Sequence, residues 1–596
     1  MTRWAILLLP VAGLLAHDPL RLDIFGLKEL VLTAGALLVG LLFAADAWRT
    51  GRPRLGWSDL SGALVVFLLV RGLMVWRAPE AGAEARSWAL LLGLVLVHHI
   101  CCASVSSAWL RRRAVPVLAA TFGLLSALAL VQASGLLEVR QVYGLFANRS
   151  FAGAGLAMLL PFALADERRR ARVYVVLGLL ALVTTQSRTG AIAAAAALAL
   201  YFGWNRPRWR LPLLGSVVLA VLVVGVAFGE RNTVKVRLHW YEAALKLGAA
   251  QPALGHGAGG FAREYPPIRP VEEHSISGGW RVHAVHNDYL QSWADGGALG
   301  LAAHLLLLVM AARAARRSRP AAASLLAFAT ASLVDLPLQD PSLLALAFLC
   351  LQMTARRRRT RVLTAPAFLS VYPALLAFSL FVVPAWSHWR ADRQLASALE
   401  ARQTRTEWRA ALDRCLELEP GNAEALELRG GEQDRERLLL QRPHDGWTHF
   451  YLVQMRDRED VAGFEQILEK HDPHHVGTLV RLAELRMKAD PLAAVSYLRR
   501  ALAADPCQYL PYLTFARLRR LQGQYDEAFR MLEEAVQRSN TPAIFLEAID
   551  LTLELSRNKK IAVAERDWRL RLSVRRAPRR LVIRRVDAAL DAAQLI

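Results

Sequence analysis

The sequence has few cysteines, and none has the spacing of a metal site, which excludes zinc-finger and iron–sulfur proteins. Five cysteines occur in 596 residues, and two of them, Cys101 and Cys102, are adjacent. Cys415 and Cys507 are the two that an oxidising compartment would allow to pair, and two unrelated buried thiols are the alternative.

Acidic residues are also scarce. The 51 aspartates and glutamates are outnumbered by 73 lysines and arginines, so the formal net charge is +22. The arginines stand in short turns between apolar runs, a placement that sets the orientation of a membrane protein and does not indicate nucleic-acid binding. Hydrophobic residues make up 54% of a chain too long for one core, so we expect an integral membrane protein with at least two domains.

Long apolar segments fill the first part of the chain and predict about 12–13 transmembrane helices. No small-residue cleavage site follows the first segment, so we interpret it as a span and not as a signal peptide. The segments lie near residues 4–20, 27–45, 60–76, 88–106, 115–133, 148–165, 173–187, 189–204, 211–228, 285–312, 321–336, 342–354 and 363–386.

Basic clusters follow every second apolar segment, so one side of the membrane carries them all. The positive-inside rule makes that side the cytoplasm. The N-terminus is then cytoplasmic, and both the 229–284 loop and the chain after about residue 387 lie on the opposite side. The clusters are Arg49–Arg54, Arg111–Arg113, Arg168–Arg172, Arg206–Arg210, Arg313–Arg319 and Arg356–Arg361.

The tail, residues 387–596, is charged, amphipathic and free of long apolar runs. Segments 492–506 and 527–540 are related by a shift of 34 residues, with alanines and leucines at helical spacing. This period resembles tetratricopeptide repeats, which stack helix pairs into a solenoid and usually bind a partner; another helical bundle is the alternative. The very basic final segment indicates either contact with anionic lipid or glycan or a solvated face.

We therefore predict an all-α protein with a polytopic membrane bundle followed by an α-solenoid. The expected domains are residues 1–386 in the membrane, with a large periplasmic loop at 229–284, and a periplasmic helical domain at 387–596.

Four ionisable residues stand where the predicted membrane segments meet the outer side. Placing an ionisable side chain there costs free energy, so these residues are candidates for a functional site. Arginine binds a diphosphate through a planar fork of donors, and histidine accepts a proton from a hydroxyl near neutral pH. The set therefore suits group transfer from a donor linked to lipid diphosphate. The residues are Arg71, Arg188, Arg237 and His286.

Each candidate also has a structural interpretation. Arg71 and Arg188 are suited to anchoring at the membrane interface. His283 and His286 are potential metal ligands, but no carboxylate or cysteine completes a recognisable ligand set, so we expect no metal and no cofactor. The glycines from Gly255 to Gly260 lack the strand-to-helix context of a phosphate cradle, which favours a tight turn with close backbone approach.

Several motifs occur in order between about residues 140 and 310, and together they resemble the O-antigen ligase family, membrane glycan ligases and polymerases with a Wzy-C region. Two positions depart from its usual pattern: Asn148-Arg149-Ser150, where a second asparagine is common, and Asp295, where glutamate is usual. The motifs are Asn148 at the start of an apolar helix, the Ser-Arg hairpin at Arg188, Arg237 followed by Trp240–Ala244, Pro252 with Gly255, Gly257 and Phe261, His286–Leu290, and Asp295 with Gly297 and Gly300.

The resemblance implies a metal-independent, inverting glycosyltransferase of the GT-C type in the bacterial inner membrane. It implies His286 as the base and Arg188 and Arg237 as the diphosphate-binding pair. The donor it implies is a glycan on undecaprenyl diphosphate, presented at the periplasmic face. Further candidates for orienting donor or acceptor are Arg71, Tyr265, Arg281, His283, Asn287 and Tyr289.

The acceptor is left open. It is a lipid A core sugar for a ligase, a second glycan for a polymerase, or a protein hydroxyl for an O-oligosaccharyltransferase. Non-enzymatic alternatives are a membrane scaffold whose repeats recruit a protein of a polysaccharide export system, and a transporter of lipid-linked glycan. A scaffold would have no need of Arg188, Arg237 and His286 together.

Overall fold

The computed structural model describes residues 1–17, 26–50, 54–78, 82–136, 145–146, 148–205, 208, 215, 232–277, 282–362, 386–399, 408–420, 422–441, 445–539 and 541–557. The chain divides into two compact units, of which the first comprises Met1–Phe261 and His283–Ala425 and the second comprises Ala262–Val282 and Leu426–Ile596. This division differs from the predicted domains in two respects. The first unit extends to Ala425, and part of the long loop groups with the tail.

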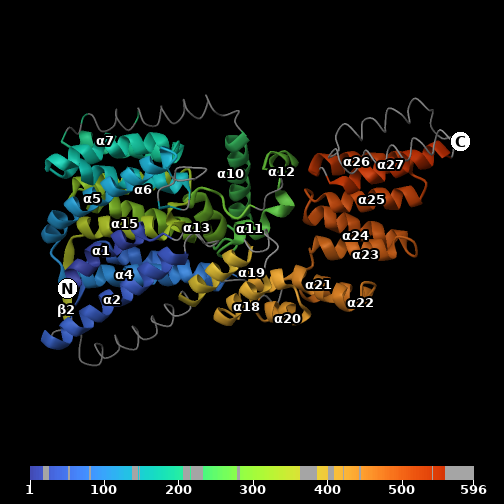
Figure 1. Ribbon diagram of the computed structural model, residues 1–596, viewed down its shortest axis with the longest axis horizontal. Helices are drawn as coiled ribbons and strands as arrows, with labels where there is room; N and C mark the ends of the chain where they lie inside the picture. Colours follow the sequence, from blue (N-terminus) through green and yellow to red (C-terminus); the bar gives the residue numbers. More distant parts are fainter. Residues whose placement is uncertain are drawn as a thin grey trace. The chain divides into compact units, whose positions relative to one another are not determined.

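Unit 1 is a bundle of helices (Figure 1). Every predicted apolar segment that the structure describes over most of its length overlaps one of them. The segments near 211–228 and 363–386 lie outside the described residues except at positions 215 and 386. The helices are α1 (Thr2–Leu15), α2 (Gly26–Thr50), α3 (Ser61–Trp76), α4 (Gly82–Ser104), α5 (Ser107–Ala133), α6 (Arg149–Ala165), α7 (Arg169–Thr184), α8 (Arg188–Gly203), α10 (Asn232–Ala250), α13 (Asp288–Ala315), α14 (Arg319–Ala331), α15 (Pro341–Thr354) and α18 (Trp408–Leu418).

The distribution of apolar residues explains where these helices lie. Helix α15 is apolar on all sides, and each of its residues is buried, as expected for a helix at the centre of a bundle. Helix α7, in contrast, exposes Val173, Val176, Leu180 and Val183. A helix in water would not present such a face, but one that contacts lipid does.

The prediction of a helical membrane protein is confirmed in this form. Four described helices have a segment long and apolar enough to cross a membrane: α2, α5, α13 and the Glu84–Ser104 part of α4. Shorter apolar helices are α1, α3, α6, α8 and α15.

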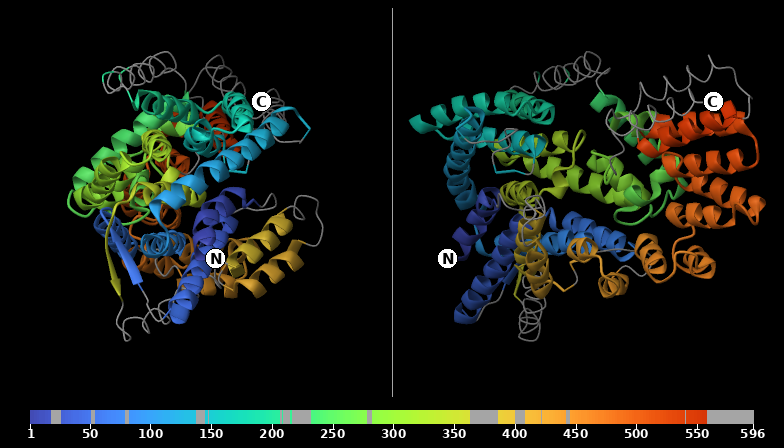
Figure 2. Two further views of the ribbon diagram at one scale, coloured as in Figure 1. Left: turned by 90° about the vertical axis from the view of Figure 1, so that its left-hand side faces the viewer. Right: turned by 45° about the vertical axis from the view of Figure 1, so that its right-hand side comes forward.

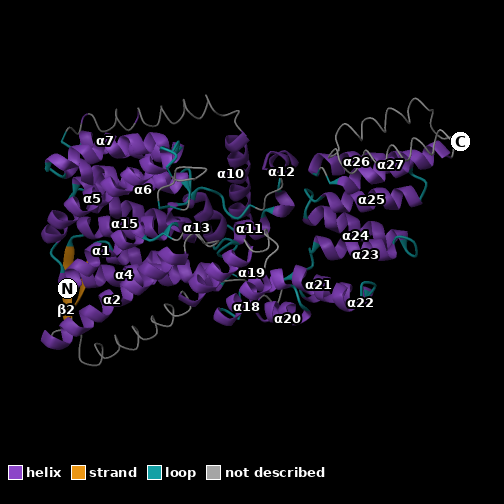
Figure 3. Ribbon diagram, in the orientation of Figure 1, coloured by secondary structure: helices purple, strands orange, loops and turns teal. Residues whose placement is uncertain are grey.

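A small β-sheet is the exception to the all-helical prediction. Strand β1 (Arg54–Ser58) pairs antiparallel with β2 (Arg357–Val362), so that Leu55 stands opposite Arg361 (Figures 2 and 3). Strand β1 begins at the last residue of one basic cluster, and β2 overlaps another, both of which the sequence assigns to turns. The pairing joins segments about 300 residues apart in the chain, so no local sequence pattern predicts it.

Two of the basic clusters contact the end of α15. The Arg317 guanidinium donates to Asp59 Oδ2 (2.7 Å) and to the Thr354 carbonyl (2.9 Å). Arg111 donates to the Met353 carbonyl (3.2 Å). The common location agrees with the alternation seen in the sequence, and the assignment of that end to the cytoplasm stays a prediction.

Unit 2 consists of helix pairs from the tail together with the middle of the long loop (Figure 1). The loop contributes the 3₁₀ turn η1 (Pro266–Ile268) and helix α12 (Val271–Ser277). The tail contributes α20 (Glu432–Gln441), α21 (Gly446–Arg456), α22 (Val461–Lys470), α23 (Val476–Arg486), α24 (Pro491–Ala504), α25 (Tyr509–Leu521), α26 (Tyr525–Arg538) and α27 (Pro542–Arg557), and α19 (Ala423–Arg429) stands at the boundary.

The 34-residue shift found in the sequence reappears in the positions of the helices. Helix α24 runs from Pro491 to Ala504, and α26 from Tyr525 to Arg538. The related positions are buried in both helices: Ala494, Leu498 and Ala501 in α24, and Ala528, Leu532 and Ala535 in α26. The shift therefore describes a repeated packing surface.

We expect Gly190→Ala to destabilise the bundle by about 1–3 kcal/mol, the usual cost of overpacking. Helices α6 and α8 cross at Gly153 and Gly190, where a Cβ on Gly190 would lie 2.5 Å from Cα of Gly153. Thermal unfolding of the purified protein in detergent measures the effect. Gly62→Ala is the matched control, because a Cβ there meets no atom within 4 Å. Equal melting temperatures for the two variants would show that the crossing is not this tight.

Candidate functional site

His286 is held in an uncommon backbone conformation immediately before α13. Its φ is 56°, in the left-handed region that side chains other than glycine seldom adopt. The imidazole stacks on Trp240 with ring centroids 5.2 Å apart and planes 23° apart, and the Tyr241 hydroxyl donates to the His286 carbonyl (3.3 Å). Burial raises the pKa of Tyr241, so its hydroxyl stays protonated as a donor. Backbone strain that the surroundings maintain in this way is typical of functional sites.

The imidazole of His286 pairs with the carboxylate of Asp335. His286 Nδ1 lies 3.1 Å from Asp335 Oδ1, with side-chain exposures of 39% and 5%. Because a carboxylate only accepts, Nδ1 carries the hydrogen and Nε2 is the nitrogen able to take up a proton. Asp335 also accepts a hydrogen bond from the Leu336 N–H (3.1 Å). The arrangement is that of an oriented general base.

The turn that carries Asp335 is bound by residues from two other segments. Arg237, on α10, donates to the Val334 carbonyl (2.6 Å). Asn287 donates from Nδ2 to the Leu333 carbonyl (2.8 Å), while its Oδ1 caps α13 by accepting from the N–H groups of Tyr289 and Leu290. Thus His286, Asn287 and Arg237 meet on one turn, although α10 and α13 are separated by the long loop.

Arg188 lies at the start of α8, at the same end of the bundle as the start of α6. Ser187 caps α8 by accepting from the Gly190 N–H (2.9 Å), and Arg188 is exposed. The crossing with Gly153 brings this end of α8 to the first turn of α6, and the side chain of Ser150 in that turn contributes to lowering the pKa of Asp335. The starts of α6 and α8 therefore lie together.

The glycine motifs of the long loop serve backbone packing. Gly255 and Gly257 have φ of 59° and 83°, and a Cβ on Gly255 would meet the Asp295 backbone at 2.5 Å. Helix α13 is kinked at Gly297, where the Ala298 N–H donates to the Pro252 carbonyl (2.7 Å). The interpretation as a tight turn with close backbone approach is confirmed.

The remaining predicted residues lie in different surroundings. Arg71 lines a small cavity with Glu29 and Glu84. The Tyr289 hydroxyl donates to the Ala329 carbonyl (2.8 Å). Of the other candidates, His283 is exposed, and Tyr265 donates to Glu273 (3.2 Å) in unit 2. Arg281 lies outside the described residues.

Asp335 was not among the residues predicted from the sequence. It stands at the outer end of the predicted segment 321–336, so the argument that selected Arg71 and His286 also applies to it. What the sequence lacks is any sign that this carboxylate faces a histidine 49 positions earlier in the chain. Among the described residues, no group of three His, Cys, Asp or Glu side chains is arranged to hold a metal ion.

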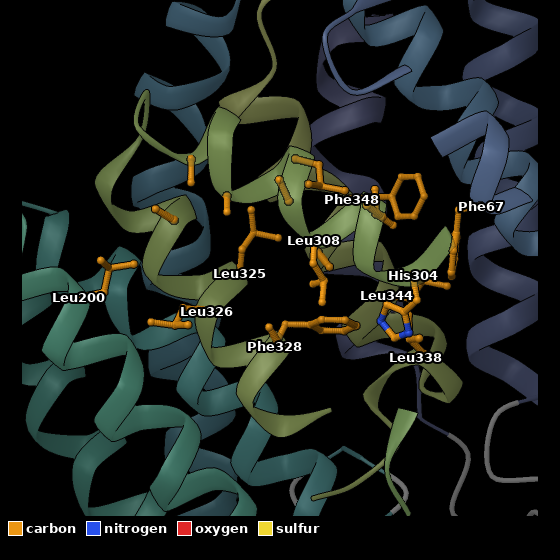
Figure 4. Close-up of a pocket in the computed structure, with 18 of the residues that line it drawn as sticks. Phe67, Leu200, His304, Leu308, Leu325, Leu326, Phe328, Leu338, Leu344 and Phe348 are labelled. Carbon is orange, nitrogen blue, oxygen red and sulfur yellow. The ribbon is translucent and has the colours of Figure 1, made fainter. Parts of the chain in front are cut away.

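An apolar cavity of about 640 Å³ lies in unit 1 (Figure 4). In this view Phe67, His304, Leu338 and Leu344 gather at one side and Leu200 at the other. The walls come mainly from α13, α14 and α15, with aliphatic and phenylalanine side chains predominating. Leu338 also connects the cavity to the site, because its N–H donates to Asp288 Oδ2 (3.2 Å), two positions after His286.

Residues 173–305 match the model of a family described as O-antigen ligase. The match begins in α7 and ends in α13, and it includes Arg188, Arg237 and His286 but not Asp335. It supports the O-antigen ligase family for this part of the chain, and with it an O-antigen ligase-type function in general. No curated protein matches the chain.

We expect Asp335→Ala to lower the stability of unit 1 by about 1–3 kcal/mol, because the donors on His286 and Leu336 lose their buried acceptor. Asp335→Asn keeps an acceptor oxygen in place and should retain most of that stability. The two variants are compared by thermal unfolding in the same detergent. Equal losses would show that the acceptor oxygen is not what holds the turn.

Proposed function

We propose that this protein is a membrane glycosyltransferase that transfers a glycan from undecaprenyl diphosphate to an acceptor hydroxyl at the periplasmic face, in lipopolysaccharide O-antigen or exopolysaccharide biosynthesis. The observation that carries the proposal is the His286–Asp335 pair beside Arg237, because it joins an oriented base to a cation within a region that matches the O-antigen ligase family.

His286 acts on the acceptor. Nε2 takes the proton of the acceptor hydroxyl as its oxygen attacks the anomeric carbon of the donor sugar. The bond from that carbon to the diphosphate breaks, and the electron pair leaves with the diphosphate. Attack opposite the leaving group inverts the anomeric configuration. Asp335 stabilises the imidazolium that forms, because its carboxylate already accepts the Nδ1 hydrogen.

The arginines act on the donor. Arg237 uses one nitrogen on the Val334 carbonyl, which orients its remaining N–H groups. Together with Arg188 it binds the diphosphate and stabilises the charge that develops on it, a task that many transferases give to a divalent cation. The reaction as proposed uses no metal or cofactor. Arg71 and His283 are further candidates for substrate contact, and Asn287 and Tyr289 act through the backbone groups that they bind.

The cavity suits the lipid part of the donor. Its aliphatic walls match an isoprenoid chain in chemistry, and ligand cavities of several hundred Å³ are usual. The proposal places the protein in the bacterial inner membrane, with a cytoplasmic N-terminus and the tail in the periplasm. The 34-residue period of α24 and α26 supports a tetratricopeptide-like fold for the tail.

His286→Ala should reduce transfer by about 10²–10⁴-fold, the usual contribution of a general base. Purified protein is incubated with lipid-linked glycan and three acceptors, namely lipid A core, a second lipid-linked glycan and a protein rich in hydroxyls, and the products are analysed by mass spectrometry. His239→Ala, on the same helix as Arg237, is the control and should transfer normally. Normal transfer by His286→Ala would favour the scaffold alternative, and the acceptor that is modified separates ligase, polymerase and protein transferase.

Arg237→Lys should raise KM for the donor and lower kcat/KM by at least about tenfold. Lysine keeps the charge but loses the planar fork that binds the Val334 carbonyl and a phosphate at once. Initial rates at varied donor concentration measure both constants. If the variant has the wild-type donor KM and kcat, Arg237 does not bind the diphosphate.

A further inference from the structure

The long loop contains a buried ion pair that the proposed reaction does not use. The Arg269 guanidinium contacts Glu273 through two nitrogens and donates to Ser277 Oγ (2.7 Å). The side chains of Arg269 and Glu273 are 9% and 0% exposed. Tyr265 donates to the same carboxylate (3.2 Å). A charged pair this deeply buried requires a cover that excludes water and satisfies the neighbouring polar groups.

The cover comes from the tail. The Cys507 thiol, 2% exposed, donates to the Arg269 carbonyl (3.3 Å), and His274 Nε2 donates to the Arg538 carbonyl (3.2 Å). Helix α12 packs against α26, and the turn η1 packs against α24. These contacts all lie within unit 2. Segment 262–277 therefore folds as a part of the tail, although its sequence position is inside the membrane domain.

The surface of the tail that receives the loop is itself rigid. Arg538 donates to the Pro506 carbonyl (2.6 Å) and to Glu534 Oε2 (2.7 Å), and its guanidinium lies over the Tyr512 ring, 4.1 Å from the centroid. Burial raises the pKa of the Cys507 thiol to about 11, so it stays a neutral donor. We call this surface, made by α24, α26 and the Asp505–Cys507 turn, the loop socket.

The residues on either side of the loop contact helix α13, whose start carries the candidate site. On one side the Phe261 N–H donates to Asp295 Oδ1 (3.0 Å), on α13. On the other side the Val285 N–H donates to Gln291 Oε1 (2.9 Å), and the next residue is His286. Phe261, before the loop, and Val285, after it, are thus both bonded to α13, and His286 with its strained backbone directly follows Val285.

We propose that the loop socket holds segment 262–277 and thereby restrains the chain that continues to His286. Arg269, Glu273 and His274 are positioning residues, which act through the loop and do not touch the substrate. The effect on His286 rests on the proposed function, whereas the binding of segment 262–277 by the loop socket is independent of it.

The test uses full-length protein purified in detergent and reads Cys507 as a native reporter. A maleimide labels accessible thiols, and the tryptic peptide 501–517 reports the modification of Cys507 by mass spectrometry. Glu273→Gln leaves the buried Arg269 without its carboxylate, and His274→Ala removes only the bond to Arg538. The matched control is Arg263→Ala, because Arg263 and Glu264 form an exposed pair in the same loop.

We expect Glu273→Gln and His274→Ala to raise the labelling rate of Cys507 by at least about tenfold, because local opening governs access to a buried thiol. They should also lower kcat by at least about tenfold with little change in donor KM, since a small misplacement of a reacting group is costly. Glu273→Asp should restore part of both values, and Arg263→Ala should match the wild type.

If the labelling rate of Cys507 is unchanged in both variants, the loop socket does not hold segment 262–277. If labelling is rapid but kcat is normal, the loop socket holds the segment without affecting His286. If the wild-type protein transfers no glycan, the proposed function fails, and the labelling rates alone then decide whether the loop socket holds the loop.

Discussion

The hydrogen bond between His286 and Asp335 joins the start of α13 to the turn after α14, and the geometry of the candidate site depends on it. A partly exposed imidazole would otherwise exchange between two tautomers and rotate among several rotamers. The carboxylate fixes which nitrogen is free, and Trp240 and Tyr241 fix the plane of the ring and the backbone beneath it. The left-handed φ of His286 is tolerated because these contacts outweigh its cost.

The motifs of the matched family region divide into two kinds. Arg188, Arg237 and His286 present chemical groups, whereas Pro252, Gly255 and Gly297 interlock the long loop with the kink in α13. The proline and the glycines help to position the arginines and the histidine. Their close backbone packing leaves the chain little freedom at the point where the loop departs from the bundle. The apolar cavity between α13, α14 and α15 lies beneath the same helix start.

The tail packs against the chain's own loop, a contact that its 34-residue period does not predict. Cys507 donates to the Arg269 carbonyl, and His274 donates to the Arg538 carbonyl. The proposed role of the tail is therefore to hold this loop, which differs from the recruitment of other molecules that is usual for repeat proteins.

The sequence by itself determined the helical membrane bundle and the 34-residue period of the tail, because these follow from local composition and periodicity. It also selected Arg237 and His286 as candidate site residues from ordered motifs, and their roles stay predictions. Charge alternation likewise indicated that the basic clusters share one end. The contacts of Arg111 and Arg317 place two of these clusters beside the end of α15, and the common location of all six stays a prediction. Only the tertiary structure decided that Asp335 faces His286, that β1 pairs with β2, and that residues 262–282 fold with the tail. Each of these joins segments far apart in the chain, and their energy comes from burial and hydrogen bonds that no local window of sequence contains.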